Sequence, residues 1–305
     1  MKKQLMADVL LLSVALIWGV TFVVVQNAIQ ILPPHLFNGI RFAMAGVFLT
    51  ILMIHPTYHI RFTRTIFING FILGLFLFFG YAFQTLGLMY TTSSKAGFIT
   101  GLSVMMVPFL SVWLLKEKLK PLSIVGAIMG TIGLFLLTMG DFTKLNLGDL
   151  LVLFCAFAFA FHIIFTDKYS KKLQAYPLTI VQIFTVSIFS FIASFLFEIW
   201  KYPINWNMVA NTKVIIALFV TSLLATAYAF VVQTKFQAYT TASRVALIFA
   251  MEPVFAAITA FIYQNERLTI LSGIGCLLIF LAMIISELPH DSIWRLKKPE
   301  QNRSV

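Results

Sequence analysis

Residues 84–126 read QTLGLMYTTSSKAGFITGLSVMMVPFLSVWLLKEKLKPLSIVG, and residues 233–275 read QTKFQAYTTASRVALIFAMEPVFAAITAFIYQNERLTILSGIG. The second stretch repeats the first at an offset of 149 positions. The matches include Gln84 with Gln233, Ser94-Lys95 with Ser243-Arg244, Glu117 with Glu266, and Gly126 with Gly275. An odd number of membrane crossings between the copies would invert the second one, and carriers use inverted repeats to build equivalent gates around one site. The repeat therefore predicts a membrane transporter.

The composition also predicts a membrane protein. Sixty per cent of the residues are apolar and 11% are charged, whereas about one-quarter of the residues in a soluble domain are charged. Ten apolar segments have about the 20 residues that a helix needs to cross roughly 30 Å of hydrocarbon. They are residues 7–31, 36–54, 65–90, 96–115, 121–140, 150–166, 177–197, 213–236, 243–263 and 268–287. The remaining loops are too short for a soluble catalytic or nucleic-acid-binding domain.

We therefore expect an all-α membrane protein whose ten transmembrane helices form two inverted five-helix repeats, in residues 1–144 and 145–289. Residues 290–305 would form a basic cytoplasmic tail. The positive-inside rule sets the orientation. With a cytoplasmic N-terminus, sixteen of the 22 Lys and Arg residues fall inside, five fall outside and one lies within a helix. Both termini are then cytoplasmic, in a multi-pass protein of the plasma or inner membrane.

The sequence predicts no metal site and no cofactor. Cys155 and Cys276 lie in apolar segments without spaced Cys or His partners, so we interpret them as packing residues. The phosphate-binding Gly-x-x-x-x-Gly-Lys-Ser/Thr loop of ATPases is absent from the sequence.

Several short motifs follow one another in a definite order along the chain. They are residues 17–22 (IWGVTF), 32–34 (LPP), 41–42 (RF), 97–102 (GFITGL), Pro108, 251–254 (MEPV) and 265–268 (NERL). In this order and spacing, the chain resembles the EamA family of the drug/metabolite transporter superfamily over nearly its whole length. One departure is that the second-half counterpart of Trp18-Gly19 is Phe159-Ala160.

The resemblance implies a bundle of two inverted five-helix repeats in the plasma or inner membrane. Members of this family move small metabolites, including amino acids, bases and drugs, and often export them. The resemblance does not specify the substrate.

Glu252 is the principal candidate for binding substrate or a coupling proton. It lies eight residues after Arg244, which places it roughly 12 Å along the helix and near the bilayer midplane. An acid there costs about 3 kcal/mol on insertion scales, so it should face a cavity or a partner. Pro253 cannot donate to the carbonyl of Phe249, which leaves a free acceptor beside the carboxylate. The structural alternative is a protonated Glu252 bonded to a neighbouring helix.

His162 and Arg41 are the other ionisable candidates. His162 could relay a proton or donate to substrate, or it could simply bond to a neighbouring carbonyl. Arg41 could bind an anion or act in gating, or it could extend to the outer surface as an anchor.

Neutral and gating candidates complete the expected site. Polar hydrogen-bonding groups and an aromatic wall would come from Gln84, Gln233, Tyr81, Tyr228, Thr100 and Trp18. The same polar groups would serve equally well as contacts between helices. Helix breaks are expected at Pro108 and Pro253, and gate contacts at Lys95 and Arg244, which could instead neutralise a nearby acid or face water.

These observations favour a secondary transporter of small organic molecules that works by alternating access and could be proton-coupled. An intramembrane enzyme would need a paired nucleophile and base, and a channel or sensor would need a repeated charged filter; neither pattern is found in the sequence. The expected partners are a small-molecule substrate and the lipid bilayer. A homodimer stays open, since Gly126 and Gly130 could serve either packing or dimer contact.

Overall fold

The computed structural model describes residues 2–53, 60–91, 93–116, 121–138, 146–201, 205–264 and 269–287, and within these ranges the regular structure is entirely helical. In chain order, the elements are α1 (Lys2–Ile29), α2 (Pro34–Met53), α3 (Arg64–Gly87), α4 (Ser93–Gly101), α5 (Ser103–Leu115), α6 (Pro121–Thr138), α7 (Leu147–Ser170), α8 (Ala175–Phe197), α9 (Trp206–Val209), α10 (Thr212–Ser222), the π-helix η2 (Leu223–Tyr228), α11 (Ala229–Phe236), the 3-10 helix η3 (Gln237–Tyr239), α12 (Ala242–Phe249), α13 (Glu252–Gln264) and α14 (Ile270–Glu287).

In the described part of the chain, eight stretches of helix are long and apolar enough to cross a membrane. They coincide with eight of the ten predicted segments. The other two predicted segments fall on shorter apolar helices, Pro121–Leu136 and Ile270–Ile285. The all-helical membrane class is thus confirmed, and the count of ten crossings stays a prediction.

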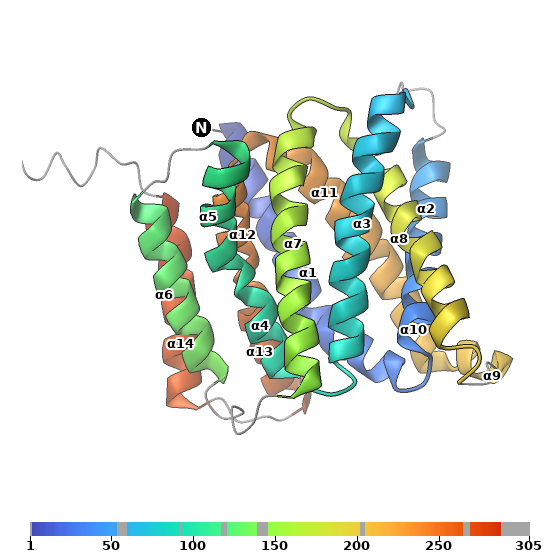
Figure 1. Cartoon of the computed structure of the whole chain (residues 1–305). Helices are drawn as coiled ribbons and strands as arrows, with labels where there is room; N and C mark the ends of the chain where they lie inside the picture. Colours follow the sequence, from blue (N-terminus) through green and yellow to red (C-terminus); the bar gives the residue numbers. More distant parts are fainter. Residues whose placement is uncertain are drawn as a thin grey trace, which may run out of the picture.

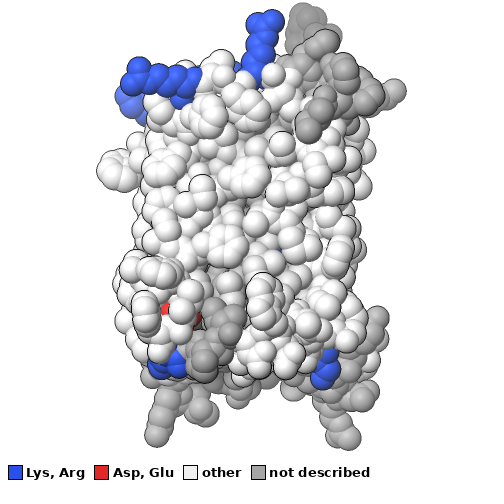
Figure 2. Space-filling view, turned by 90° about the vertical axis from the view of Figure 1, so that its right-hand side faces the viewer, with Lys and Arg blue, Asp and Glu red and all other residues white. Residues whose placement is uncertain are grey.

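The second half of the chain runs opposite to the first. In Figure 1, α1 starts at the end of the bundle marked N, whereas α7 starts at the other end and runs antiparallel to it. The helices α6 and α14 pack against each other at one side of the bundle. Figure 2 shows Lys and Arg at the two ends of the face in view, with an uncharged belt between them. Such a belt suits the hydrocarbon layer of a bilayer.

Two of the long apolar stretches are broken at equivalent positions. The first break lies between α4 and α5, at Leu102, and the second lies between α12 and α13, at Ala250 and Met251. At both, the chain tightens by a backbone bond to the third residue back: Leu102 N donates to Ile99 O (3.1 Å) and Met251 N to Ile248 O (3.1 Å). Each second half-helix begins at the same repeat position, since Ser103 plus 149 gives Glu252. The repeat therefore places a helix start at one point in both halves.

Small residues bring the helices close around these breaks. A Cβ at Gly19 of α1 would meet the Glu252 carbonyl oxygen at 2.5 Å, so α1 packs directly on the start of α13. Gly74 of α3 packs in the same way on Thr185 of α8, and Gly133 of α6 on the Gly275 carbonyl oxygen of α14 (2.8 Å). Close approach through small residues is the usual packing of membrane helices.

Candidate functional site

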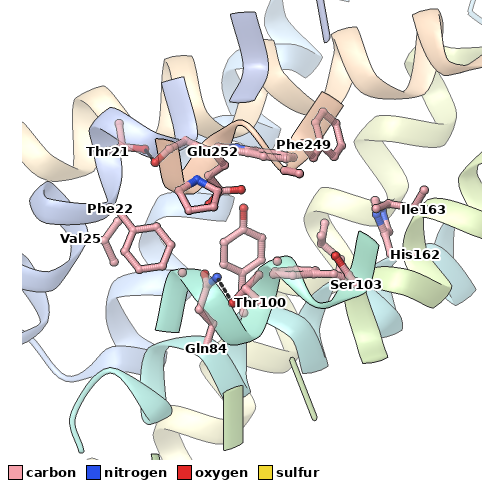
Figure 3. A pocket seen from close by; sticks show the side chains of 18 of the residues that line it. Thr21, Phe22, Val25, Gln84, Thr100, Ser103, His162, Ile163, Phe249 and Glu252 are labelled. Atoms are coloured by element: carbon pink, nitrogen blue, oxygen red, sulfur yellow. Dashed lines mark hydrogen bonds between the residues drawn. The ribbon is translucent and has the colours of Figure 1, made fainter. Parts of the chain in front are cut away.

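A cavity of about 80 Å³ lies between helices of both repeats. On this measure one water needs about 10–15 Å³, so the cavity has room for several waters or a small solute. Figure 3 shows the labelled side chains converging from α1, α3, α4, α7 and the α12–α13 break. Nine of the sequence candidates line this cavity: Trp18, Arg41, Tyr81, Gln84, Thr100, His162, Gln233, Glu252 and Pro253.

The cavity wall is built from repeat-equivalent pairs. The 149-residue offset relates Tyr81 to Phe230, Gln84 to Gln233, Thr100 to Phe249, Gly101 to Ala250, Ser103 to Glu252 and Val104 to Pro253, and all twelve line the cavity. For α1 and α7 the offset is shorter, and it relates Trp18 to Phe159, Thr21 to His162 and Phe22 to Ile163. The pairs share positions but not chemistry. The two ionisable members, Glu252 and His162, both belong to the second repeat.

Arg41 is buried in the cavity wall, with 2% of its surface exposed. Its Nε donates to Thr226 Oγ1 at 2.7 Å and its Nη2 to the Ala225 carbonyl at 3.2 Å. The guanidinium also lies 4.9 Å from the centre of the Tyr81 ring. The surface-anchor alternative for Arg41 is therefore wrong, because these contacts hold the side chain inside the bundle.

A π-helical turn supplies the carbonyl that Arg41 uses. In η2, the N–H of Ala229 bonds to the carbonyl of Leu224, five residues back, instead of that of Ala225. The Ala225 carbonyl accepts from two side chains of the cavity wall, Trp18 Nε1 at 2.8 Å and Arg41 Nη2 at 3.2 Å. The irregular turn therefore fixes both an aromatic ring and a cation at the cavity.

Glu252 stands at the first position of α13, beside the second helix break. Its side chain lines the cavity, and no hydrogen bond or ion pair joins it to another described residue. Pro253 contributes no N–H and sits against Gly97 of α4, whose Cβ position is 3.7 Å from the proline ring. Tyr81 lies within electrostatic reach of both Glu252 and Arg41. A carboxyl group and a guanidinium thus share one small cavity, with no ion pair between them among the described residues.

His162 is held by a buried polar chain. Its Nε2 lies 2.9 Å from Gln182 Oε1, and Gln182 Nε2 donates to Thr234 Oγ1 at 3.0 Å. The imidazole packs edge-on against Phe230, with ring centroids 5.9 Å apart. The ring is therefore bound to a side-chain amide, and not to a backbone carbonyl.

The two repeat-related glutamines differ in their partners. Gln84 Nε2 donates weakly to Thr100 Oγ1 at 3.4 Å, the dashed line in Figure 3. The counterpart of Thr100 beside Gln233 is Phe249, which cannot accept a hydrogen bond. Gln233 is 1% exposed, and its Oε1 has no hydrogen-bond partner. A buried acceptor without a partner costs about 1–3 kcal/mol, so a donor on a ligand or water would be stabilised there.

Two sequence candidates lie away from the cavity. Tyr228 is 36% exposed and bonds to Ser13 Oγ at 2.8 Å on the outside of the bundle. Its cavity placement is wrong, because the repeat counterpart of Tyr81 is Phe230, two residues further on. Pro108 is buried inside α5, so the predicted break at Pro108 is also wrong; the chain instead tightens six residues earlier, at Leu102.

The two gate candidates also lie outside the cavity lining. Arg244 bonds through Nη2 to Asp8 Oδ2 at 2.5 Å, an ion pair with a nearby acid that either a neutralising or a gating role would use. The side chain of Lys95 lies outside the described part of the structure. Among the described residues, no cluster of three or more His, Cys, Asp or Glu side chains could hold a metal ion.

The sequence interpretation missed several apolar members of the wall, among them Phe159, Phe230 and Phe249, together with the partners of Arg41. The repeat contained the signal for the apolar members, because each is the counterpart of a candidate or of its neighbour in the first repeat. The partners of Arg41 lie in the π-helical turn, for which the sequence offers no comparable signal.

Comparisons with known proteins agree with this architecture. The family described as "EamA-like transporter family" matches residues 5–139 and 146–287. An "Uncharacterized transporter" of Archaeoglobus fulgidus is 36% identical over 287 residues, covering 94% of this chain and 87% of its own. The "Uncharacterized transporter YoaV" of Bacillus subtilis is 24% identical over 279 residues, covering 88% of this chain and 92% of its own.

One solved crystal structure superposes with a TM-score of 0.76, covering 92% of this chain and 98% of that chain. The two sequences are 19% identical, so this likeness shows the fold alone.

Proposed function

The chain belongs to the EamA-like transporter family, and on that premise we propose that it exports small organic metabolites, amino acids among them, by alternating access. It is a membrane transporter and a multi-pass protein of the cell membrane. The substrate class, the direction and the mechanism are the proposed part. The observation that carries them is a cavity built from equivalent positions of both repeats, with one buried cation and one carboxyl group in its wall.

The proposed topology has ten crossings in two five-helix repeats, residues 1–144 and 145–289, with both termini in the cytoplasm. The short helices α6 and α14 would supply the two further crossings, the fifth and the tenth in chain order. They pack along each other and expose apolar side chains such as Ile132 and Phe280. The excess of Lys and Arg on the predicted inner side supports the orientation.

The charges of the cavity favour a zwitterionic substrate. The guanidinium of Arg41 is buried without an acidic partner among the described residues, which favours a carboxylate on the ligand. The carboxyl group of Glu252 can accept hydrogen bonds from an ammonium group. Phe22, Phe230 and Phe249 give the rest of the wall an apolar character that suits a short side chain. A small amino acid combines all three features.

Proton coupling is the second part of the proposal. Glu252 is a titratable group in the middle of a span, at a broken helix, without a hydrogen bond to another described residue. Transporters place coupling groups at such breaks. His162, fixed by Gln182, is another titratable group of the cavity wall and is the comparison for Glu252.

Resistance of an overexpressing strain to toxic amino-acid analogues tests the export proposal. The chain should raise the tolerated concentration of analogues with free ammonium and carboxylate groups. Tyr81→Phe should reduce this resistance because Tyr81 lines the cavity beside Arg41, whereas Tyr228→Phe, outside the cavity, should leave it unchanged. Equal resistance with and without the chain across the analogue set would argue against export of amino acids.

A further inference from the structure

A single ion pair of the described residues ties the two repeats together at the end where the chain begins. Asp8 of α1 accepts from Nη2 of Arg244 of α12 at 2.5 Å, and both side chains are largely buried. The other ion pair formed within the described residues, Lys171 with Asp167, lies at the C-terminal end of α7 at a spacing of four residues. The first pair can therefore hold α1 against α12, whereas the second cannot join two helices.

The Asp8–Arg244 pair lies next to a buried apolar cluster in sequence and structure. Leu11, Val107, Ile164, Val245 and Ala246 form one buried cluster beneath it, each with at most 1% of its surface exposed. Gln237 Nε2 adds a bond from η3 to the Ile163 carbonyl at 2.7 Å. Packed side chains from both repeats thus connect this end of the bundle to Ile163, which lines the cavity.

The repeat generates the same acid and cation at the opposite end. Asp8 stands ten residues before Trp18, and Asp149 stands ten residues before Phe159, the counterpart of Trp18. The counterpart of Arg244 at the 149-residue offset is Lys95. Asp149 lies in the first turn of α7, at the far end of the bundle, and is 4% exposed.

The surroundings of Asp149 show that this second acid also joins helices. Its Oδ1 accepts from Thr91 Oγ1 at 2.5 Å, just beyond the end of α3, and its Oδ2 accepts from Asn146 N at 3.0 Å. The counterpart of Thr91 is Thr240, whose Oγ1 is buried without a hydrogen-bond partner. The two acids therefore occupy equivalent positions but have different described partners, a guanidinium for Asp8 and a threonine hydroxyl for Asp149.

We propose that the Asp8–Arg244 ion pair and the Asp149–Thr91 hydrogen bond are repeat-related latches, one at each end of the bundle, and that the first must separate before the cavity opens to the cytoplasm. This goes beyond the proposed function, because it concerns access to the cavity and not the substrate. A partly exposed ion pair has a modest interaction energy, which suits a contact that must form and break in every cycle.

Accessibility of a cysteine in the cavity tests the latches without any substrate. The reporter is Ser103→Cys, in a chain whose Cys155 and Cys276 are replaced by alanine, and the probe is a membrane-impermeant maleimide. In inside-out vesicles, Asp8→Asn and Arg244→Gln should each raise the labelling rate about fivefold, as expected for the loss of a partly exposed pair. Thr91→Val, which removes the hydroxyl that donates to Asp149, should instead raise labelling from the outside, in right-side-out vesicles.

Two controls make the result decisive. The double variant Asp8→Arg with Arg244→Asp restores an ion pair of reversed direction, so its labelling rate should return towards that of the parent. A protein that labels faster because it is misfolded would not show this recovery. Asp167→Asn removes the acid of the intrahelical pair at the same end and should leave labelling unchanged. The proposal is overturned if Asp8→Asn and Arg244→Gln label like the parent, if Asp167→Asn matches them, or if the exchange fails to restore the rate.

Discussion

Arg41 is the residue most able to decide which molecules the cavity accepts. It is buried, donates to a threonine hydroxyl and a backbone carbonyl, and lies over the Tyr81 ring. Because these partners are neutral, they do not neutralise the guanidinium charge, and the charge can attract an anionic group of a ligand. Carboxylate recognition by Arg41 is therefore the simplest account of a charge placed at such cost inside a membrane protein.

Arg41→Gln should weaken binding of carboxylate substrates about ten- to a hundredfold, because a charged hydrogen bond contributes about 1.5–3 kcal/mol. The matching amides should lose little affinity. Competition binding with each acid and its amide on the purified protein measures the difference. Arg64→Gln, at the exposed start of α3, is the matched control and should change neither. Equal weakening for acid and amide would show that Arg41 acts only on the fold.

Glu252→Gln should abolish accumulation driven by a pH gradient while exchange of substrate across the membrane persists. Glutamine keeps the shape and hydrogen bonds of the side chain but cannot bind and release a proton. Gradient-driven flux and exchange, measured in the same proteoliposomes, separate the two effects, with His162→Gln for comparison. Gradient coupling that survives in Glu252→Gln removes this residue as the proton carrier, and a loss of affinity for ammonium-bearing substrates alone would assign it to binding.

At the scale of the elements, the two helix breaks define where the site lies. Both second half-helices start at the same repeat position, so Ser103 and Glu252 are the same structural position with different chemistry. Gly19 sets how closely α1 approaches the second break, because its Cβ position is 2.5 Å from the Glu252 carbonyl oxygen and 2.9 Å from the Ala256 nitrogen. Backbone atoms cannot move away as a flexible side chain would.

Gly19→Ala should therefore destabilise the folded protein by about 1–3 kcal/mol, the usual cost of overpacking. Gly273→Ala is the matched control, since no heavy atom lies within 4 Å of its Cβ position in α14. Alanine favours a helix over glycine, so Gly273→Ala should be neutral or slightly stabilising. Thermal unfolding in detergent compares the two, and equal midpoints would mean that α1 has room to shift away from α13.

The element boundaries show what the sequence could and could not predict. Pro253, whose missing N–H is visible in the sequence, lies two residues after one break. Pro108 did not mark the other, which lies six residues earlier at Leu102, next to the close contact of Gly101 with Leu134. The π-turn that positions Arg41 and Trp18 was likewise invisible, because residues 223–228 have no unusual composition.

At the scale of the whole molecule, the repeat made most of the architecture predictable. The 149-residue offset relates helix starts, cavity residues and the opposed directions of the two halves. Apolar length then located eight candidate spans without further information. The partners of individual side chains could be identified only in the structure. Tyr228 shows this, because it lies only two positions from Phe230, which lines the cavity, yet its side chain points to the outside of the bundle.

The orientation of the bundle can be tested with cysteines at exposed positions. Cysteines at Asn146 and Asn205 should react with an impermeant thiol reagent in intact cells, while one at Gln174 should react only after the membrane is opened. In Figure 1 the turns that hold the first two lie at the end opposite the one marked N. Labelling of Gln174→Cys from outside would reverse the proposed topology.

Counterflow in proteoliposomes is the most direct test of the central claim, that one cavity built from both repeats carries a zwitterion across the membrane by alternating access. Vesicles loaded with a mixture of unlabelled amino acids are diluted into trace radiolabelled ones. We predict a transient accumulation of label above equilibrium, absent without protein and lost in Arg41→Gln. A simple approach to equilibrium without overshoot, whatever the internal load, would indicate a channel, and no flux of any amino acid would contradict the proposed substrate class.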